Sequence, residues 1–279
     1  MWEKRYDLFS FARSHREQRI YSDDELKKLL RLAFLYHNGW TITNLMALPD
    51  DKIKSEVKHI AVSNLNYQTF ILHLVHAAAD LNEAAFMEAL NGLIQVVGVE
   101  KTIIEVCYPY LLRLDVLWTR TKAVSAQERF SSYLIQSTLL NETTAFSSLQ
   151  NEPPELVLFS PEKEGNDLPL LFLNYLLRKA GWKVFYLGGN NSLADLKRAA
   201  SLPSIFYLYL HLPENTAGIF IDDYLATLRQ TFPGKIIFAS GKGIEQNQRR
   251  FLRVYLLRND EAIYRMIASK KELARTLPY

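Results

Sequence analysis

The chain has 279 residues, of which 48% are hydrophobic and 23% charged, so it holds enough apolar material for two or more buried cores. It has no uncharged apolar run long enough to cross a bilayer, and its N-terminus lacks the pattern of a secretory signal, so we expect a cytoplasmic protein. The net charge of +3 does not by itself indicate a nucleic-acid partner, and the single cysteine, Cys107, excludes an intrachain disulfide and indicates a small buried hydrophobe.

Residues 1–60 predict a small basic helical unit. In its first third, basic side chains alternate with aromatic ones, a pattern that contacts phosphates in nucleic-acid-binding proteins. A capping box, Ser22-Asp-Asp-Glu25, opens an amphipathic helix that is expected to stop at Gly39. Shorter helices are expected after Thr41 and after Pro49.

Residues 61–150 are expected to form a bundle of four helices. Apolar residues recur at helical spacing in four blocks between Asn66 and Ser148, and breaks separate the blocks at 80–82, at Gly98 and around Val124. Four helices joined by short loops favour an antiparallel bundle.

Residues 151–279 begin with a proline-marked linker, after which strands and helices alternate. The predicted strands are the short apolar runs Leu156–Ser160, Lys183–Leu187, Ser204–Leu210, Lys235–Ala239 and Arg253–Leu257. The predicted helices are Leu168–Ala180, Ser192–Ala200, Phe220–Thr231 and Asp260–Lys271. This α/β alternation predicts a five-stranded parallel sheet of flavodoxin-like (Rossmann-like) order, with ligands at the carboxyl ends of the strands.

Two glycine-containing turns follow strands of this domain, at Leu187–Asn190 and at Ser240–Gly243. Neither has the spacing of a nucleotide-binding loop, and both fit ordinary strand-to-helix turns. His211 ends the third strand, but no acidic residue nearby in sequence would orient it, so we expect it to be incidental. No paired carboxylates, no nucleophile with its base and no metal-ligand spacing stands out, so the chain is expected not to be an enzyme.

Two stretches at the start of the chain resemble signatures of a known DNA-binding module. Trp2-Glu-Lys-Arg-Tyr6 resembles W-E-K/R-R-Y, and Arg19-Ile-Tyr-Ser-Asp-Asp-Glu-Leu26 resembles R-x-Y-S/T-x-x-D/E-L, both from the winged helix-turn-helix of the MerR type. With the bundle and the flavodoxin-like domain behind them, the chain resembles MerR-type transcription regulators with a cobalamin-binding sensor module, the group of the light-responsive carotenoid regulators. The resemblance implies DNA contacts from the head and its wing by Lys4, Arg5, Tyr6, Arg13, Arg16, Arg19 and Tyr21.

The chain departs from this pattern at its beginning, because it starts inside the recognition helix. The head is therefore a partial one, and we expect the natural protein to start upstream. Without the first helix, binding to DNA is expected to be weak, to show little sequence preference and to fall steeply with salt. The resemblance also implies a homo-oligomer, with the sensor module as the dimerisation or signal-input part.

The positions that hold cobalamin in this family are altered. In the bundle, Trp118 and Glu128 match the W-x9-E-H motif that covers adenosylcobalamin, but Arg129 replaces the histidine. In the α/β domain, Asn166 and Pro169 stand where the E-x-H-x-x-G loop has the cobalt-coordinating histidine and the glycine. An amide is a poor cobalt ligand compared with a neutral imidazole.

Two further positions of the module differ. Tyr209 stands in the S-x-L element, where it would intrude on the groove for the nucleotide tail, and the paired glycines of the fourth loop survive as Ser240-Gly241. We therefore expect a MerR-type regulator with a degenerate sensor module and no cofactor. The alternatives are a functional cobalamin-binding sensor and the corrinoid carrier protein of a methyltransferase system.

Overall fold

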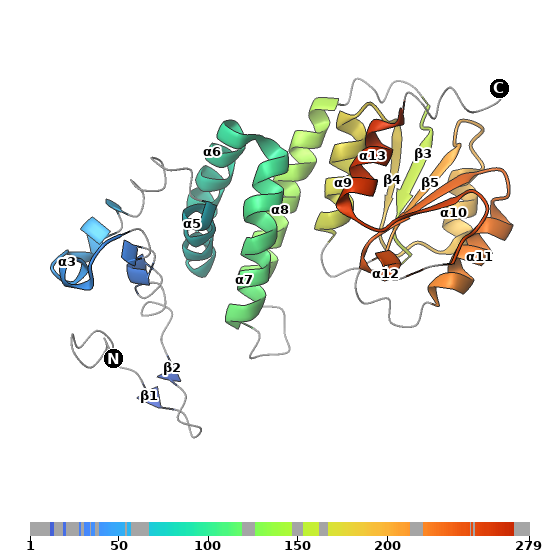
Figure 1. Cartoon of the computed structure of the whole chain (residues 1–279). Helices are drawn as coiled ribbons and strands as arrows, with labels where there is room; N and C mark the ends of the chain where they lie inside the picture. Colours follow the sequence, from blue (N-terminus) through green and yellow to red (C-terminus); the bar gives the residue numbers. More distant parts are fainter. Residues whose placement is uncertain are drawn as a thin grey trace. The chain divides into compact units, whose positions relative to one another are not determined.

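The computed structural model describes residues 12–13, 19–20, 28, 31–33, 35–36, 39–53, 55–56, 67–118, 126–146, 153–161, 167–212, 220–245, 247 and 249–270. The chain divides into two compact units, Met1–Leu134 and Ile135–Tyr279 (Figure 1). Each unit contains its own buried apolar residues. Within the described residues, no helix is both long enough and apolar enough to cross a membrane.

The described part of the head contains a short antiparallel pair of strands and a capped helix. Strand β1 (Ala12–Arg13) pairs with β2 (Arg19–Ile20). Helix α3 (Ile42–Met46) begins after Thr41, whose hydroxyl accepts a hydrogen bond from the backbone N–H of Asn44 at 3.4 Å. The other helical residues described here are 28, 31–33, 35–36, 50–53 and 55–56. These elements do not confirm a helix-turn-helix, because its predicted recognition helix lies outside the described residues.

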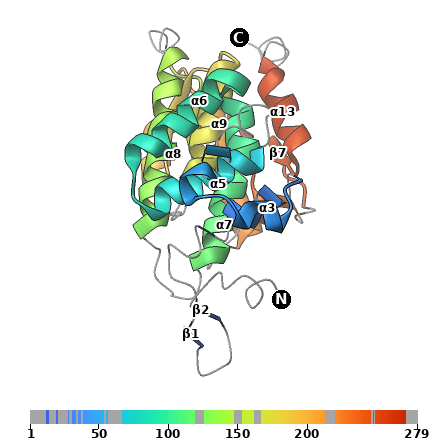
Figure 2. The same ribbon diagram turned by 90° about the vertical axis from the view of Figure 1, so that its left-hand side faces the viewer.

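The helical bundle follows, in which α5 packs against α6 and α7 (Figures 1 and 2). The bounds of the bundle helices are α5 Tyr67–Ala79, α6 Glu83–Thr102, α7 Tyr108–Trp118 and α8 Ala126–Thr143. A π-helical turn, η1 (Ile103–Cys107), joins α6 to α7 without a loop. The predicted break at Gly98 is a kink inside α6, where the glycine has a φ of 83° that most other residues avoid.

Aromatic contacts connect three helices of the bundle. The ring of Phe86 in α6 meets the rings of Tyr110 in α7 and Phe130 in α8 edge-on, at centroid distances of 5.7 and 6.0 Å. The hydroxyl of Tyr110 lies 2.5 Å from Ser131 Oγ, so this buried polar group has a partner. Cys107 is buried as predicted, and burial raises the pKa of its thiol to about 12.

The second unit is built on a parallel sheet with the strand order β4-β3-β5-β6-β7. The strands are β3 Leu156–Phe159, β4 Val184–Gly188, β5 Tyr207–His211, β6 Ile236–Ser240 and β7 Val254–Leu257. The helices are α9 Leu168–Lys179, α10 Leu193–Ala200, α11 Ile221–Thr231, α12 Lys242–Glu245 and α13 Asp260–Ala268. The predicted five-stranded, flavodoxin-like sheet is confirmed, whereas α12 was not predicted because four residues are too short to show helical periodicity.

Alternate strand residues point to opposite faces of this sheet. On one face Leu208, Leu210 and Ile237 join the core that α10 and α11 cover. On the other face, Tyr207 stacks with Phe238 at 6.0 Å and meets Trp182 edge-on at 5.2 Å. Figure 1 shows α9 and α13 on one side of the sheet and α10 and α11 on the other. We call the face with the rings the aromatic face; it comprises Trp182, Tyr207, Tyr209, Phe238 and Tyr255.

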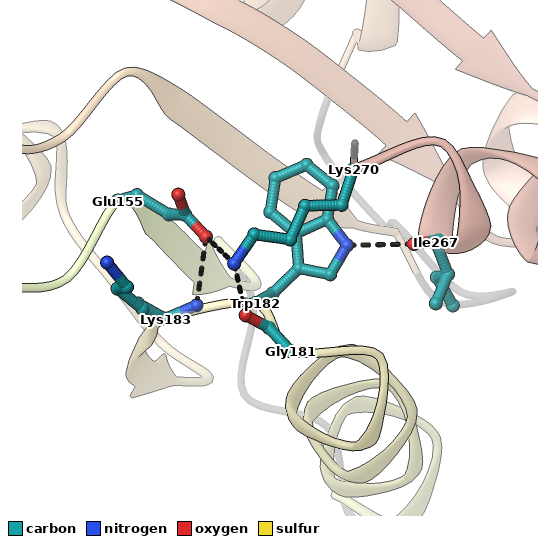
Figure 3. Close-up of polar contacts among 6 residues, drawn as sticks. All are labelled: Glu155, Gly181, Trp182, Lys183, Ile267 and Lys270. Atoms are coloured by element: carbon teal, nitrogen blue, oxygen red, sulfur yellow. Dashed lines mark hydrogen bonds and ion pairs between the residues drawn. The ribbon is translucent and has the colours of Figure 1, made fainter. Parts of the chain in front are cut away.

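Polar contacts fasten the end of the last helix to the amino end of the sheet (Figure 3). The Nζ atom of Lys270 lies 2.6 Å from Oε1 of Glu155 and donates a hydrogen bond to the carbonyl of Gly181. The same carboxylate oxygen accepts a hydrogen bond from the backbone N–H of Lys183 at 3.1 Å. The side chains of Lys270 and Glu155 are only 23% and 22% exposed, so water screens their pairing less than it screens a surface ion pair.

Trp182 adds a buried hydrogen bond between α13 and the segment before β4, because its indole N–H donates to the carbonyl of Ile267 at 2.9 Å (Figure 3). We expect Trp182→Phe to lower the free energy of unfolding of the second unit by about 1–3 kcal/mol, since the carbonyl loses its donor and the ring contact shrinks. Chemical denaturation measures the change. The control is Arg265→Gln, which breaks a pair with Glu261 that is 75% and 78% exposed, and we expect it to cost less than about 0.5 kcal/mol. Equal midpoints for Trp182→Phe and the unaltered chain would contradict this role.

Candidate functional site

The candidate site is the carboxyl edge of the sheet, where three neighbouring strands end in polar side chains. Ser160 directly follows β3, His211 ends β5 and Ser240 ends β6. His211 lies opposite Ser240 in the strand register, and Phe159 lies opposite Leu210, which places Ser160 one step further along, beside His211. Because paired residues of parallel strands point to the same face, the three side chains form one row on the aromatic face. We call Ser160, His211 and Ser240 the polar row.

Ser240 is the centre of the hydrogen bonds in the polar row. Its Oγ accepts a hydrogen bond from the hydroxyl of Tyr209 at 3.0 Å and lies 3.1 Å from Nδ1 of His211. Tyr209 and Ser240 are fully buried, and burial raises the pKa of the Tyr209 hydroxyl, which therefore stays a protonated donor. Burial also lowers the pKa of His211 to about 4, so its imidazole is neutral near pH 7.

Ser160 has a well-held backbone and an unsatisfied side chain. Its N–H donates to the carbonyl of Gly188 at 2.9 Å, and its carbonyl accepts a hydrogen bond from Nδ2 of Asn191 at 3.1 Å. The residue is only 1% exposed, yet its Oγ has no hydrogen-bond partner among the described residues. A buried hydroxyl without a partner costs about 1–3 kcal/mol, so a ligand that supplied the missing hydrogen bond would be favoured at this position.

Gly241 shapes the turn that follows the polar row. Its φ is 102°, and a Cβ atom at this position would lie 1.9 Å from the carbonyl oxygen of Leu212. The N–H of Leu212 in turn donates to the carbonyl of Ser240 at 2.8 Å. The two chain segments leaving β5 and β6 therefore run in direct backbone contact, which only glycine allows here.

Of the α/β residues implied by the family resemblance, the structure brings Tyr209, Ser240 and Gly241 together at this edge. Pro169 lies in the first turn of α9 and is partly buried. Asn166 lies outside the described residues. Tyr209 belongs to the aromatic face, where its ring lies 6.4 Å from that of Phe238.

The implied bundle residues belong to the first unit. Glu128 is partly buried and Arg129 is exposed in the first turn of α8, whereas Trp118 ends α7 and its side chain lies outside the described part. Arg13 and Arg19 belong to β1 and β2, where only the backbone is described. The remaining implied DNA contacts lie outside the described residues; they are Lys4, Arg5, Tyr6, Arg16 and Tyr21.

Sequence reasoning overlooked Ser160 and set His211 aside. His211 was expected to be incidental because no acidic residue stands near it in the sequence, but its partner is Ser240, 29 positions later. Only the pairing of β5 with β6 brings the two side chains together. A signal was nevertheless present in the sequence, because one predicted apolar strand ends at Ser160 and two others are followed directly by His211 and Ser240.

No protein-family model matches this chain, and no curated protein matches it by sequence. Among solved structures, the Methanosarcina barkeri monomethylamine corrinoid protein matches with a TM-score of 0.54 at 13% identity, over 73% of this chain and 99% of that chain. A methanol:cobalamin methyltransferase complex from Methanosarcina barkeri matches with a TM-score of 0.38 at 13% identity, over 88% and 93%. A cobalamin-binding protein from Desulfitobacterium hafniense DCB-2 matches with a TM-score of 0.29 at 12% identity, over 76% and 99%.

At this identity, the likeness to the monomethylamine corrinoid protein shows the fold alone, a flavodoxin-like domain together with helices. The likeness contradicts the expectation that the chain takes no cofactor, because it points to cobalamin instead. That expectation was wrong because it weighed single positions such as Asn166 and Pro169. A site at the carboxyl edge is assembled from the ends of several strands, and their side chains can supply its contacts.

Two residues of the polar row offer chemical groups of the kinds that bind a corrinoid. Ser160 offers a buried hydroxyl that lacks a partner, and His211 offers a neutral imidazole, the nitrogen ligand that suits a transition-metal ion. Both belong to the edge where ligands of doubly wound sheets bind. The fit rests on these side chains and not on the loop that contains Asn166.

The close backbone contact at Gly241 gives a test of how the edge is built. We expect Gly241→Ala to destabilise the second unit by about 2 kcal/mol or more, because the new Cβ atom would collide with the Leu212 carbonyl and the backbone would keep a left-handed φ. Chemical denaturation measures the loss. The matched control is Gly234→Ala, where nothing lies within 4 Å of the added Cβ atom, and the expected change is within about 0.5 kcal/mol. Equal losses for the two variants would rule out the crowding at Gly241.

Proposed function

We propose that this chain is a corrinoid-binding protein, which holds cobalamin or a related corrinoid at the carboxyl edge of its sheet and presents it to a partner without being an enzyme itself. The observation that carries the proposal is the polar row, in which a buried Ser160 hydroxyl lacks a partner beside a neutral imidazole. The likeness to a corrinoid protein over 99% of that protein's length supports the same function.

The residues of the edge would have separate tasks in such a site. The Ser160 hydroxyl would form a hydrogen bond with the ligand and so recover the free energy that its burial costs. Gly241 would keep the β5 and β6 turns close together, so that the ligand meets a preformed surface. When bound, a corrinoid supplies a cobalt ion that can carry an alkyl group, and this is the chemistry that a carrier offers to a partner enzyme.

A second, finer proposal is that the chain is a MerR-type regulator whose corrinoid site senses a signal, acting in the cytoplasm as a homo-oligomer. The observation that favours it is the antiparallel pair β1–β2, which lies in the segment where the resemblance places the wing. Arg13 and Arg19 stand opposite each other in this pair, as basic residues of a DNA-contacting hairpin would.

Corrinoid binding can be tested directly on the full chain. After incubation with hydroxocobalamin or adenosylcobalamin in the dark and passage over a desalting column, we expect the visible spectrum of the protein fraction to show an equimolar corrinoid. Ser160→Ala should weaken binding about five- to tenfold, because one hydrogen bond to the ligand is lost. The control is Ser201→Ala, which changes an exposed serine at the end of α10 and should leave affinity unaltered. A colourless protein fraction would refute the proposed function.

The DNA-binding proposal calls for its own measurement. Fluorescence anisotropy with unrelated DNA duplexes should give weak affinities that differ little between sequences and fall steeply as salt increases. The double variant Arg13→Ala/Arg19→Ala should bind more weakly still, whereas Arg265→Gln, in the exposed pair on α13, should not. Tight, operator-specific binding at physiological salt, or affinity independent of salt, would count against this proposal.

A further inference from the structure

We propose that His211 is the protein's own ligand to the cobalt of the bound corrinoid, through Nε2, and that Ser240 is the residue that positions it. The inference rests on the proposed function, since it assigns the metal ligand within that site. It places the ligand at the end of β5, and not in the loop that contains Asn166, where the family resemblance looked for it.

The second unit contains few side chains that bind a transition-metal ion through nitrogen or sulfur. His211 is the only histidine between Ile135 and Tyr279, and the single cysteine of the chain, Cys107, belongs to the first unit. A cobalt ion at the carboxyl edge of the sheet therefore has one imidazole in this unit to bind. Asn166 offers only an amide, which is a weaker ligand for such an ion.

The two ring nitrogens of His211 differ in their hydrogen bonding. Nδ1 of His211 lies 3.1 Å from Ser240 Oγ, and no described residue hydrogen-bonds Nε2. Histidines that bind metals typically use one ring nitrogen for the metal and hold the other in a hydrogen bond that fixes the ring. His211 has this arrangement already, with Ser240 as the fixing partner.

Ser240 also favours one tautomer of the His211 ring. A serine oxygen has two lone pairs, so Ser240 Oγ can accept hydrogen bonds from the Tyr209 hydroxyl and from Nδ1–H of His211 together. In that tautomer Nε2 carries a lone pair and no proton.

The position of His211 completes the case. β5 is the central strand of the sheet, with β3 and β6 on either side, and His211 is its last residue. Ser160, whose buried hydroxyl has no described partner, stands beside it at the end of β3. The Ser160 hydroxyl and Nε2 of His211, neither with a described hydrogen-bond partner, thus lie at the edge where a doubly wound sheet binds its ligands.

The test uses the full chain prepared with ¹⁵N-labelled histidine and loaded with cob(II)alamin, and reads the electron paramagnetic resonance spectrum. An axial ¹⁴N ligand splits the cobalt lines into triplets, whereas an axial ¹⁵N ligand splits them into doublets. We expect doublets from the labelled protein and triplets from the unlabelled protein. Labelled His73→Gln, which alters a histidine of α5, should still give doublets.

Two variants distinguish the role of His211, the proposed cobalt ligand, from that of Ser240, the proposed positioning residue. Labelled His211→Gln should lose the doublets, and Ser240→Ala should keep them while binding cob(II)alamin about tenfold more weakly. If cob(II)alamin is bound in equimolar amount but the labelled chain gives no doublets, His211 is not the ligand and the proposed function stands. If no cob(II)alamin is bound at all, both proposals fail. The labelled unaltered chain decides the first point even if His211→Gln does not fold.

Discussion

The parallel pairing of β5 with β3 and β6 is the constraint on which the candidate site depends. Each strand contributes one polar side chain at its carboxyl end, and the register places the three at one level and on one face. A shift of any strand by one residue would turn its polar side chain into the opposite core, which α10 and α11 cover with apolar residues. The packing of the apolar core therefore fixes the strand register, and the register fixes the positions of the three polar side chains.

The aromatic face explains how buried polar groups are tolerated at this edge. Tyr209 and Ser240 are fully buried, but each satisfies the other through a hydrogen bond, and the ring of Tyr209 lies 6.4 Å from that of Phe238 at a tilt of 42°. At the opposite end of the same face, the Trp182 indole is satisfied by the carbonyl of Ile267. The exception among the described residues at this edge is Ser160, whose hydroxyl lacks a partner and is the group that the proposed ligand would satisfy.

The family resemblance has two parts, the sensor module and the DNA-binding head, and only the fold of the first is confirmed. The flavodoxin-like domain and the helices before it are confirmed as a fold, and the likeness to a corrinoid protein replaces the expectation of no cofactor. The partial winged head remains a prediction, supported by the strand pair β1–β2. The difference arises because strand–helix alternation is repeated over more than a hundred residues, whereas the head signatures occupy two short stretches.

The architecture of the second unit follows from patterns in the sequence. Apolar runs of strand length alternate with stretches of helical periodicity, and these patterns specify elements locally because each depends on residues close together in the chain. The site, in contrast, exists only in the folded chain. The contacts of Ser240 with Tyr209 and His211 span 31 and 29 positions, and the pairing of Phe159 with Leu210 brings Ser160 next to His211. No local pattern encodes such neighbours, since they exist only after the sheet has paired its strands.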